Sequence, residues 1–426
     1  MTTVCVHGLG YVGLPTAALF AHNGYDVVGF DVDERKLDRL HRRDLTLGEA
    51  DLEAYIVEAL EEGTLTPSAT VEPADVHLIC VPTPLDFEAE RADLKYVLSA
   101  ADAITDVLRE GDTVILESTV PPGTTEGPLR EALERSGMRA GEDFYLGYSP
   151  ETVLPGDILH ELRANDRFVG GVDEHSTDHA AALYEPCIDG TVHRTPDATT
   201  AEFVKLAQNA YRDLNIGFAN EMARIARDYG VDSRAAIALA NRHSRVDILQ
   251  PGPGVGGHCL PVDPLFFAHD SESLDLIYSA RRVNDGMSQY VADILEAELG
   301  SLEGKRVAVL GVAYKANVDD TRNSPGLKLA QTLKQATPER ALADGGLALD
   351  TRVADPLVDD ESLDLVSVDD AVADADAIVV ATDHDVFRDL DPAAIRGKMR
   401  GNLLLDTKGT MDADAWTGAG FDVVGL

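Results

Sequence analysis

Residues 3–31, TVCVHGLGYVGLPTAALFAHNGYDVVGFD, decide the fold. The apolar run at residues 3–8 predicts a buried parallel strand, Leu14–Asn23 predicts a helix, and Tyr25–Phe30 predicts a second strand. Strand, helix and parallel strand are the repeating unit of α/β proteins. The stretch therefore predicts a Rossmann-like α/β domain in this part of the chain.

The turn between the first strand and the helix has the spacing GxGxxG, formed by Gly8, Gly10 and Gly13. An acid, Asp31, follows the second strand 18 residues beyond the third glycine. Such glycines let a pyrophosphate approach the helix N-terminus, where free N–H groups and the helix dipole favour anions. Asp31 would accept from ribose hydroxyls and repel a 2′-phosphate, which favours NAD over NADP, while the basic pair at residues 35–36 opposes that preference.

The alternation of strands and helices continues toward residue 196. The apolar runs Val76–Val81 and Thr113–Leu116 each end in proline and hydroxyl residues, and Phe144–Gly147 runs into Ser149-Pro150-Glu151. In an open α/β sheet, ligands bind beyond the carboxyl ends of the strands. The three strand ends therefore predict a ligand-binding edge, with ordinary strand-to-helix turns as the alternative for any one of them.

The pattern changes to a helical period at Thr199–Tyr229, which contains no proline and one glycine. It predicts one long helix, on which Lys205, Asn209 and Asp213 share a stripe because they are four residues apart. A solvated surface lysine is the alternative for Lys205. Further helices are expected at Ser233–Asn241 and Asp275–Leu299.

The stretch between these two helices, LQPGPGVGGHCLPVDP at Leu249–Pro264, presents Cys259 directly after Gly256-Gly257-His258. Glycines let a backbone pass close to a ligand, and prolines stiffen the loop. A thiol in such a loop is typical of a nucleophile, and a buried structural cysteine is the alternative. A metal site at His258 and Cys259 is disfavoured, because the nearby His243 and Asp263 lack zinc-ligand spacing.

A second α/β unit begins at Lys305 and lacks the three-glycine pattern. Its expected strands are Arg306–Leu310, Arg352–Ala354, Ala377–Ala381 and Leu403–Asp406. The predicted architecture is α/β, with two Rossmann-like parallel-sheet domains joined by a long central helix. The expected division is 1–196 for a NAD-binding domain, 197–300 for a central helical domain with the cysteine loop, and 301–426 for a second nucleotide-binding domain.

The composition excludes some partners. The 426 residues carry a net charge of −39, with 75 acidic residues against 36 basic ones, of which nine are lysines. Nucleic acid and anionic membranes are poor partners for a protein whose surface has such a negative electrostatic field. No apolar run is long enough to cross a bilayer. Abundant acids and scarce lysine suggest adaptation to high salt, where the field is screened within about 3 Å at 1 M. Four scattered cysteines and the lack of a charged leader predict reduced thiols in the cytoplasm.

Taken together, these segments resemble the family of nucleotide-sugar 6-dehydrogenases that act on UDP-glucose, GDP-mannose and UDP-N-acetylhexosamines. The resemblance covers nearly the whole chain, and its motifs occur in the family's order. They are GLGYVGLP, FDVDERKLDRL, VPTPLD, ESTVPPGTT, YSPETVLPG, EFVKLAQNAYRDLNIGFANE, GPGVGGHCLPVDP and LGVAYKANVDDTRNSP. Within the family, NRHSRVDILQPGPGVGGHC most resembles the UDP-N-acetyl-D-mannosamine dehydrogenases, with UDP-N-acetylglucosamine and UDP-glucose as alternative substrates.

The resemblance implies two successive NAD⁺-dependent oxidations of a sugar C6 alcohol, with the aldehyde trapped by a thiolate. It implies Cys259 as the nucleophile, Lys205 and Asn209 at the C6 oxygen, Asp263 as a proton relay, Glu151 as acid or base, and Thr119 orienting a water. The implied cofactor contacts are Gly8, Gly10, Val12, Gly13, Asp31, Lys36, Thr83, Thr119, Glu151 and Arg322. The implied substrate contacts are Leu154, Lys205, Asn209, Arg242, Gly256 and the rest of the 249–257 loop, and Lys315.

Two positions depart from the family's pattern. Thr152 stands where an arginine often follows Ser-Pro-Glu, so a cation beside Glu151 is expected to be missing. Lys408 stands nearest to the arginine usual at the uridine site, and lysine cannot offer arginine's bidentate fork. A non-catalytic nucleotide-sugar sensor is the rival of another class. The apolar residues of the long helix exceed one face, which predicts a homodimer packed through it, with Arg242 or Arg245 reaching the neighbouring site.

Overall fold

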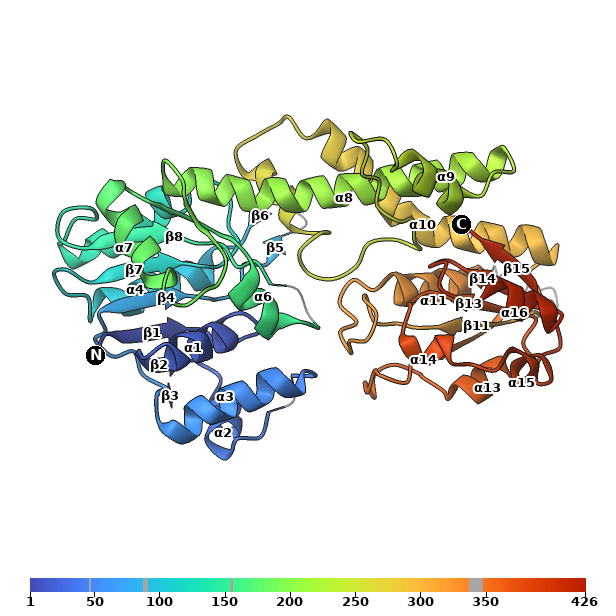
Figure 1. Ribbon diagram of the computed structural model, residues 1–426, viewed down its shortest axis with the longest axis horizontal. Helices are drawn as coiled ribbons and strands as arrows, with labels where there is room; N and C mark the ends of the chain where they lie inside the picture. The colour runs from blue at the N-terminus through green and yellow to red at the C-terminus, as the bar shows by residue number, and fades with distance from the viewer. Residues whose placement is uncertain (46, 87–90, 154–155, 337–347) are drawn as a thin grey trace. The chain divides into compact units, whose positions relative to one another are not determined.

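The computed structural model describes residues 1–45, 47–86, 91–153, 156–336 and 348–426, which form two compact units (Figure 1). Unit 1 consists of Met1–Gln208 and Leu265–Ser273, and unit 2 of Asn209–Pro264 and Leu274–Leu426. Among the described residues, no helix is long and apolar enough to cross a membrane.

Unit 1 contains an eight-stranded sheet in the order β10-β9-β8-β7-β4-β1-β2-β3. Its strands are β1 (Thr3–His7), β2 (Asp26–Phe30), β3 (Leu65–Ser68), β4 (Val76–Ile79), β7 (Thr113–Leu116), β8 (Tyr145–Tyr148), β9 (Arg167–Gly171) and β10 (Val192–Arg194). The six strands from β3 to β8 are parallel to one another, and β9 runs antiparallel to β8. The predicted parallel Rossmann-like sheet is confirmed, with β9 and β10 as an additional edge pair.

The helices of unit 1 connect these strands and cover the sheet. They are α1 (Gly13–His22), α2 (Glu34–Arg42), α3 (Ala50–Glu62), α4 (Lys95–Thr105), α5 (Arg130–Leu133), α6 (Ile158–Ala164) and α7 (Glu174–Tyr184), with a short hairpin of β5 (Leu85–Asp86) and β6 (Arg91–Ala92). Val4 and Val6 on β1 pack with Leu14 and Phe20 of α1 in one buried cluster. On the other face of the sheet, Ile79 of β4 and Val114 and Leu116 of β7 pack against α4 in a second buried cluster. The two clusters hold the carboxyl ends of the parallel strands at one edge.

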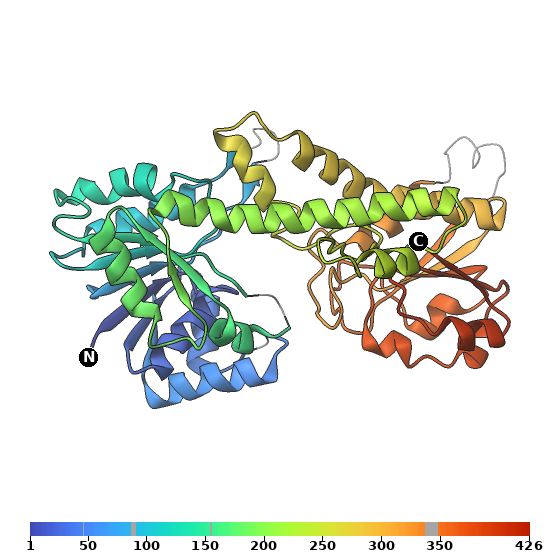
Figure 2. The same ribbon diagram turned by 45° about the horizontal axis from the view of Figure 1, so that its top comes forward.

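The central helix α8 runs without interruption from Ala198 to Asp228 (Figures 1 and 2). It confirms the predicted long helix within one residue at each end. In unit 2, α8 lies close to α10 (Asp275–Leu299), and a Cβ built on Gly217 would come within 3.2 Å of the Ala280 Cα. The glycine is therefore required for the close approach of the two helices.

Unit 2 contains a five-stranded, fully parallel sheet in the order β12-β11-β13-β14-β15. Its strands are β11 (Arg306–Leu310), β12 (Asp350–Ala354), β13 (Ala377–Val380), β14 (Leu403–Asp406) and β15 (Asp422–Gly425). Its other helices are α9 (Ser233–Ala240), α11 (Pro325–Gln335), α13 (Val368–Val372), α14 (Asp385–Arg388), α15 (Pro392–Arg396) and α16 (Ala413–Gly418). The predicted second Rossmann-like sheet is confirmed, and β15 is an additional strand that was not predicted from the sequence.

Short polar residues begin several of these helices. Asp33 caps α2 by accepting from the Arg35 N–H, and Asp232 caps α9 by accepting from the Arg234 and Ala235 N–H groups. Ser324 caps α11 and is followed by Pro325 at the first helical position. These caps satisfy backbone donors that have no partner within the helix.

Candidate active site

The glycine turn of unit 1 has the shape that a dinucleotide requires. Gly8 has φ +95, and a Cβ built on Gly13 would lie 1.9 Å from the Gly8 carbonyl oxygen. A Cβ built on Gly10 would meet nothing within 4 Å. Two of the glycines are therefore needed for the turn and the helix packing, and the third faces open space where a pyrophosphate fits.

Asp31 lies at the end of β2 and points to this turn. Its Oδ2 accepts from the Leu9 N–H at 2.8 Å and from the Lys36 Nζ at 2.5 Å, and its Oδ1 accepts from the Asp33 N–H at 2.9 Å. The structure thus brings together two predicted cofactor residues, Asp31 and Lys36. The ion pair was not anticipated, and it offsets part of the carboxylate charge beside the ribose position.

Two further predicted cofactor residues meet at the carboxyl ends of β4 and β7. The Thr83 Oγ1 donates to the Thr119 carbonyl at 2.6 Å, and the Ser118 Oγ donates to the Val81 carbonyl at 2.7 Å. The two strand ends are therefore tied to each other through side chains, next to the turn that β1 supplies.

Glu202 on α8 is a buried polar residue that was not anticipated from the sequence. Its carboxylate is fully buried and accepts from the Gly123 N–H at 2.5 Å, the Thr125 N–H at 2.8 Å and the Thr125 Oγ1 at 2.6 Å. Burial raises the pKa of Glu202 to about 7, against the lowering effect of these donors. Glu202 thus fixes the loop after Thr119 to the helix that carries Lys205, and a charged residue among apolar neighbours was its only sequence signal.

Lys205 and Glu151 lie together in unit 1. The Lys205 Nζ donates to the Glu151 carbonyl at 2.6 Å and lies 3.6 Å from its Oε2. The expectation that no cation lies beside Glu151 is therefore wrong, because the Lys205 ammonium lies beside its carboxylate. Both side chains are buried, so the surface alternative for Lys205 is also wrong. Leu154, predicted to contact substrate, lies outside the described residues.

In unit 2, the cysteine loop presents an accessible thiol. Cys259 is exposed, whereas Cys5, Cys80 and Cys187 are free and buried. The Cys259 carbonyl accepts from the Val262 N–H at 3.0 Å and the Asp263 N–H at 2.8 Å, which forms a tight turn behind the thiol. The alternative of a buried structural cysteine is therefore wrong for Cys259.

The loop is held by the segment that follows β11. Gly257 has φ +85, and a Cβ there would lie 2.9 Å from the Tyr314 ring. The Gly257 N–H donates to the Arg322 carbonyl at 2.9 Å, and its carbonyl accepts from the Asn323 Nδ2 at 2.9 Å. A Cβ on Gly256 would lie 2.8 Å from the Asn323 carbonyl oxygen. The two glycines before Cys259 therefore exist for close backbone packing.

Asn209 and Asp263 meet behind the cysteine turn. The Asn209 Nδ2 donates to the Asp263 Oδ2 at 2.6 Å, and both side chains are buried. Asp213, one turn further on α8, instead accepts from the Arg281 Nη1 at 2.6 Å and the Asn284 Nδ2 at 2.8 Å. The three members of the predicted stripe on α8 therefore have separate partners: Lys205 contacts Glu151, Asn209 contacts Asp263, and Asp213 ties α8 to α10.

The remaining predicted residues are more exposed. Arg322 donates to the Asp320 carboxylate, from its Nε to Oδ1 at 3.0 Å and from its Nη2 to Oδ2 at 2.6 Å. Hydrogen bonding to Asp320 raises the pKa of Arg322. Arg242 and Lys315 are exposed on loops of unit 2. Lys408 lies 3.2 Å from the Asp383 Oδ1.

Arg234, on the first turn of α9, was missed from the sequence. Its Nη2 donates to the Thr407 carbonyl at 2.9 Å and to the Pro251 carbonyl at 2.8 Å. A Cβ on Gly409 would lie 2.3 Å from the Arg234 Nε. The guanidinium thus joins the start of the cysteine loop to the end of β14, beside the position where Lys408 was expected to replace an arginine.

Three profiles of the UDP-glucose/GDP-mannose dehydrogenase family match the chain: the NAD binding domain at residues 2–188, the central domain at 199–286 and the UDP binding domain at 308–413. The UDP-N-acetyl-D-mannosamine dehydrogenase of Methanocaldococcus jannaschii is 40% identical over 99% of this chain and 95% of its own. An NDP-N-acetyl-D-galactosaminuronic acid dehydrogenase of Ralstonia solanacearum is 39% identical over 96% of each chain.

Among solved structures, the UDP-N-acetyl-D-mannosamine dehydrogenase of Pyrococcus horikoshii superposes with a TM-score of 0.89 at 38% identity, over 100% of this chain and 99% of that one. A dinucleotide-binding α/β domain, a second nucleotide-binding sheet and an exposed thiol define an NAD-dependent dehydrogenase of nucleotide sugars. The chain belongs to the UDP-glucose/GDP-mannose dehydrogenase family. It is an NAD-dependent nucleotide-sugar 6-dehydrogenase.

Proposed function

We propose that the enzyme oxidises the C6 alcohol of UDP-N-acetyl-D-mannosamine to the uronate in two successive steps. The observation that carries the four-electron chemistry is Cys259, the one exposed thiol among the four. Its backbone carbonyl accepts from the Asp263 N–H, and the Asp263 carboxylate accepts from the Asn209 amide. The sugar assignment is supported by NRHSRVDILQPGPGVGGHC and by the relatives of that specificity at about 40% identity.

NAD⁺ fits the unit 1 turn through the space at Gly10 and through Asp31, Lys36, Thr83 and Val12, and when bound it accepts the hydride in both oxidations. In the first oxidation the C6 hydroxyl loses its proton through water held by Asp263 and Lys205. The Lys205 ammonium and the Asn209 amide hold the negative charge that develops on the oxygen.

In the second oxidation the thiolate of Cys259 attacks the aldehyde carbon. A carbon–sulfur bond forms, and the carbonyl electron pair moves to the oxygen held by Lys205 and Asn209. Loss of hydride from that carbon restores the carbonyl as a thioester. A water oriented by Thr119 then attacks, Glu151 accepts its proton, the carbon–sulfur bond breaks, and the thiolate of Cys259 is released with the uronate.

We assign the nucleotide sugar to Arg242, Lys315, Gly256 and the 249–257 loop, and the cofactor to Arg322 in addition to the unit 1 residues. The division we propose is 1–196 for NAD, 197–300 for the central helices and cysteine loop, and 301–426 for UDP. The β11 segment supports a link between the last two, because Tyr314, Arg322 and Asn323 fix the backbone of the cysteine loop.

We also propose a homodimer packed through α8. Within unit 2, Tyr211, Phe218 and Ile225 are 59%, 46% and 42% exposed and recur every seven residues along one stripe. Exposed aromatic and aliphatic side chains on one helix face are typical of a buried interface. Sedimentation should give a dimer, and Phe218→Glu should convert it to monomer; a wild-type chain that is monomeric and active would refute the dimer.

The acidic surface supports a protein that works in molar salt. The melting temperature should rise as salt is added, because salt screens the electrostatic repulsion within a chain of net charge −39. Thermal melts in buffer with and without molar KCl test this, and equal stability at low salt would contradict it.

Substrate comparison tests the specificity. Initial rates of NADH formation are measured with UDP-N-acetylmannosamine, UDP-N-acetylglucosamine and UDP-glucose in molar salt. The highest kcat/KM should belong to the mannosamine substrate. Preference for another sugar would retain the mechanism and overturn the sugar assignment. Binding of nucleotide sugar without turnover of any would favour the sensor.

A further inference from the structure

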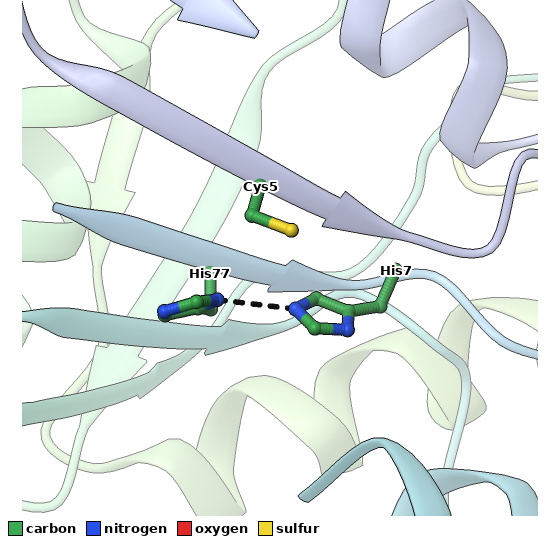
Figure 3. Close-up of side chains that lie close together, drawn as sticks. All are labelled: Cys5, His7 and His77. Carbon is green, nitrogen blue, oxygen red and sulfur yellow. Dashed lines mark hydrogen bonds between the residues drawn. The ribbon is translucent and has the colours of Figure 1, made fainter. Parts of the chain in front are cut away.

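Cys5 and His7 on β1 and His77 on β4 form a buried cluster in the unit 1 sheet (Figure 3). Cys5 is in register with His77, and His7 follows two residues along its strand, so the three side chains leave the same face of the sheet. All three are fully buried, and one ligand atom from each lies within 4.8 Å of the other two. The proposed reaction uses none of them.

The two rings satisfy each other only in part. The His7 Nε2 and the His77 Nδ1 are 3.1 Å apart and share one hydrogen bond, whereas the His7 Nδ1 and the His77 Nε2 have no partner among the described residues. Buried polar atoms of this kind cost stability, and two apolar residues would fill a β-sheet interior without that cost. Imidazole nitrogens are the commonest metal ligands among protein side chains.

We propose that Cys5, His7 and His77 bind one copper(I) ion. One soft thiolate with two imidazoles is a ligand set that suits copper. A monovalent ion with one thiolate is neutral overall, which favours a site without solvent. Zinc prefers four ligands, and within the part of the chain that the structure describes the cluster holds only these three groups that can ligate a metal.

The step is an exchange of a proton for a metal. Cys5 would bind a soft metal as its thiolate, so its thiol proton must leave when the metal binds. On binding, the S–H bond breaks, a sulfur–copper bond forms, and the proton leaves to solvent. The ion lies where the two ring nitrogens now face each other. Metal–nitrogen bonds of about 2.0 Å in a trigonal site place two nitrogens about 3.5 Å apart, so the rings separate by only a few tenths of an ångström.

The experiment uses the full chain carrying Cys259→Ala, which removes the one exposed thiol that would also bind copper. Copper(I) is titrated anaerobically against a chromophoric copper(I) chelator. One ion per chain is expected. Its affinity should fall about 100-fold or more in the further variant His7→Val/His77→Val and stay unchanged in Cys187→Ala, which alters another buried cysteine of unit 1. Equal affinity with and without the two histidines would overturn the proposal.

X-ray absorption at the copper edge of the loaded Cys259→Ala protein gives a second test, which holds even if the histidine variants fold poorly. One sulfur and two nitrogen neighbours are expected, and a shell of nitrogen and oxygen alone would overturn the proposal. A parallel titration with Zn²⁺ tests the metal: tighter binding of Zn²⁺ than of copper(I) at this site would overturn the assignment to copper.

Discussion

The Asn209 amide on α8 donates to the buried Asp263 carboxylate at 2.6 Å, four residues after Cys259. Asp263 also donates its own N–H to the Cys259 carbonyl at 2.8 Å. The central helix therefore holds the Asp263 carboxylate, and the Asp263 backbone in turn holds the backbone of Cys259. Lys205 precedes Asn209 by one helical turn, so the same helix supplies the cation and the amide that the proposed oxyanion needs.

We predict that Asn209→Ala lowers kcat by about 100-fold, because the oxyanion loses a donor and Asp263 loses the hydrogen bond from the Asn209 amide. The variant should still bind nucleotide sugar, since other residues are assigned to the nucleotide. Stopped-flow NADH formation measures kcat, and equilibrium dialysis measures binding. An unchanged kcat would remove Asn209 from the mechanism.

Gly257→Ala should reduce activity by about 100-fold, because its backbone has φ +85 and the new methyl would lie 2.9 Å from the Tyr314 ring. Gly286→Ala is the matched control. Gly286 lies within α10, where a Cβ meets nothing within 4 Å, so this change should stabilise the protein by about 0.5–1 kcal/mol. Paired kinetics and thermal melts would contradict the account if Gly257→Ala were as active as its control.

Asp31→Asn should weaken the preference for NAD over NADP by about tenfold, because the carboxylate that repels a 2′-phosphate is gone and Lys36 loses its ionic partner. The ratio of kcat/KM for the two cofactors measures this. A ratio equal to that of the wild type would show that Asp31 does not discriminate between them.

The pKa of Glu202, raised to about 7, makes stability depend on pH. The folded protein holds this proton over a pH range where the unfolded chain, near its ordinary value of 4.5, has lost it. Its contribution is therefore full below pH 4.5 and is lost as the pH rises through about 7. Glu202→Gln cannot titrate, so we predict that the wild-type free energy of unfolding, minus that of the variant, falls between these pH values. Urea melts across this range measure the difference, and a flat or rising one would contradict the prediction.

Much of the fold could be predicted from local pattern. The strands β1, β2 and β4 follow from apolar runs, and α8 follows from a long helical period without proline. The strand β15 escaped notice because its sequence, DVVG, is short and only partly buried. The β9–β10 pair escaped notice because β9 runs antiparallel to β8, outside the βαβ pattern that the glycine turn begins.

The candidate site could be predicted where a motif carries its own spacing: the structure shows the tight turn at Gly8 and Gly13, the open space at Gly10 and the exposed Cys259. Residues whose hydrogen-bond partners lie far away in the sequence could not be predicted in this way. Glu202 meets Thr125, and Arg234 meets Thr407, across separations of 77 and 173 residues. The cation beside Glu151 was misjudged for the same reason, because Lys205 is 54 positions away in sequence.

The most direct test of the four-electron mechanism is the amount of NADH formed per UDP-N-acetylmannosamine consumed, in molar salt, for the wild type and for Cys259→Ala. The wild type should form two NADH per sugar and release the uronate, and the variant should lose this yield because no thiohemiacetal can form. A wild-type yield of one NADH with free aldehyde, or an unchanged yield of two in Cys259→Ala, would contradict the account.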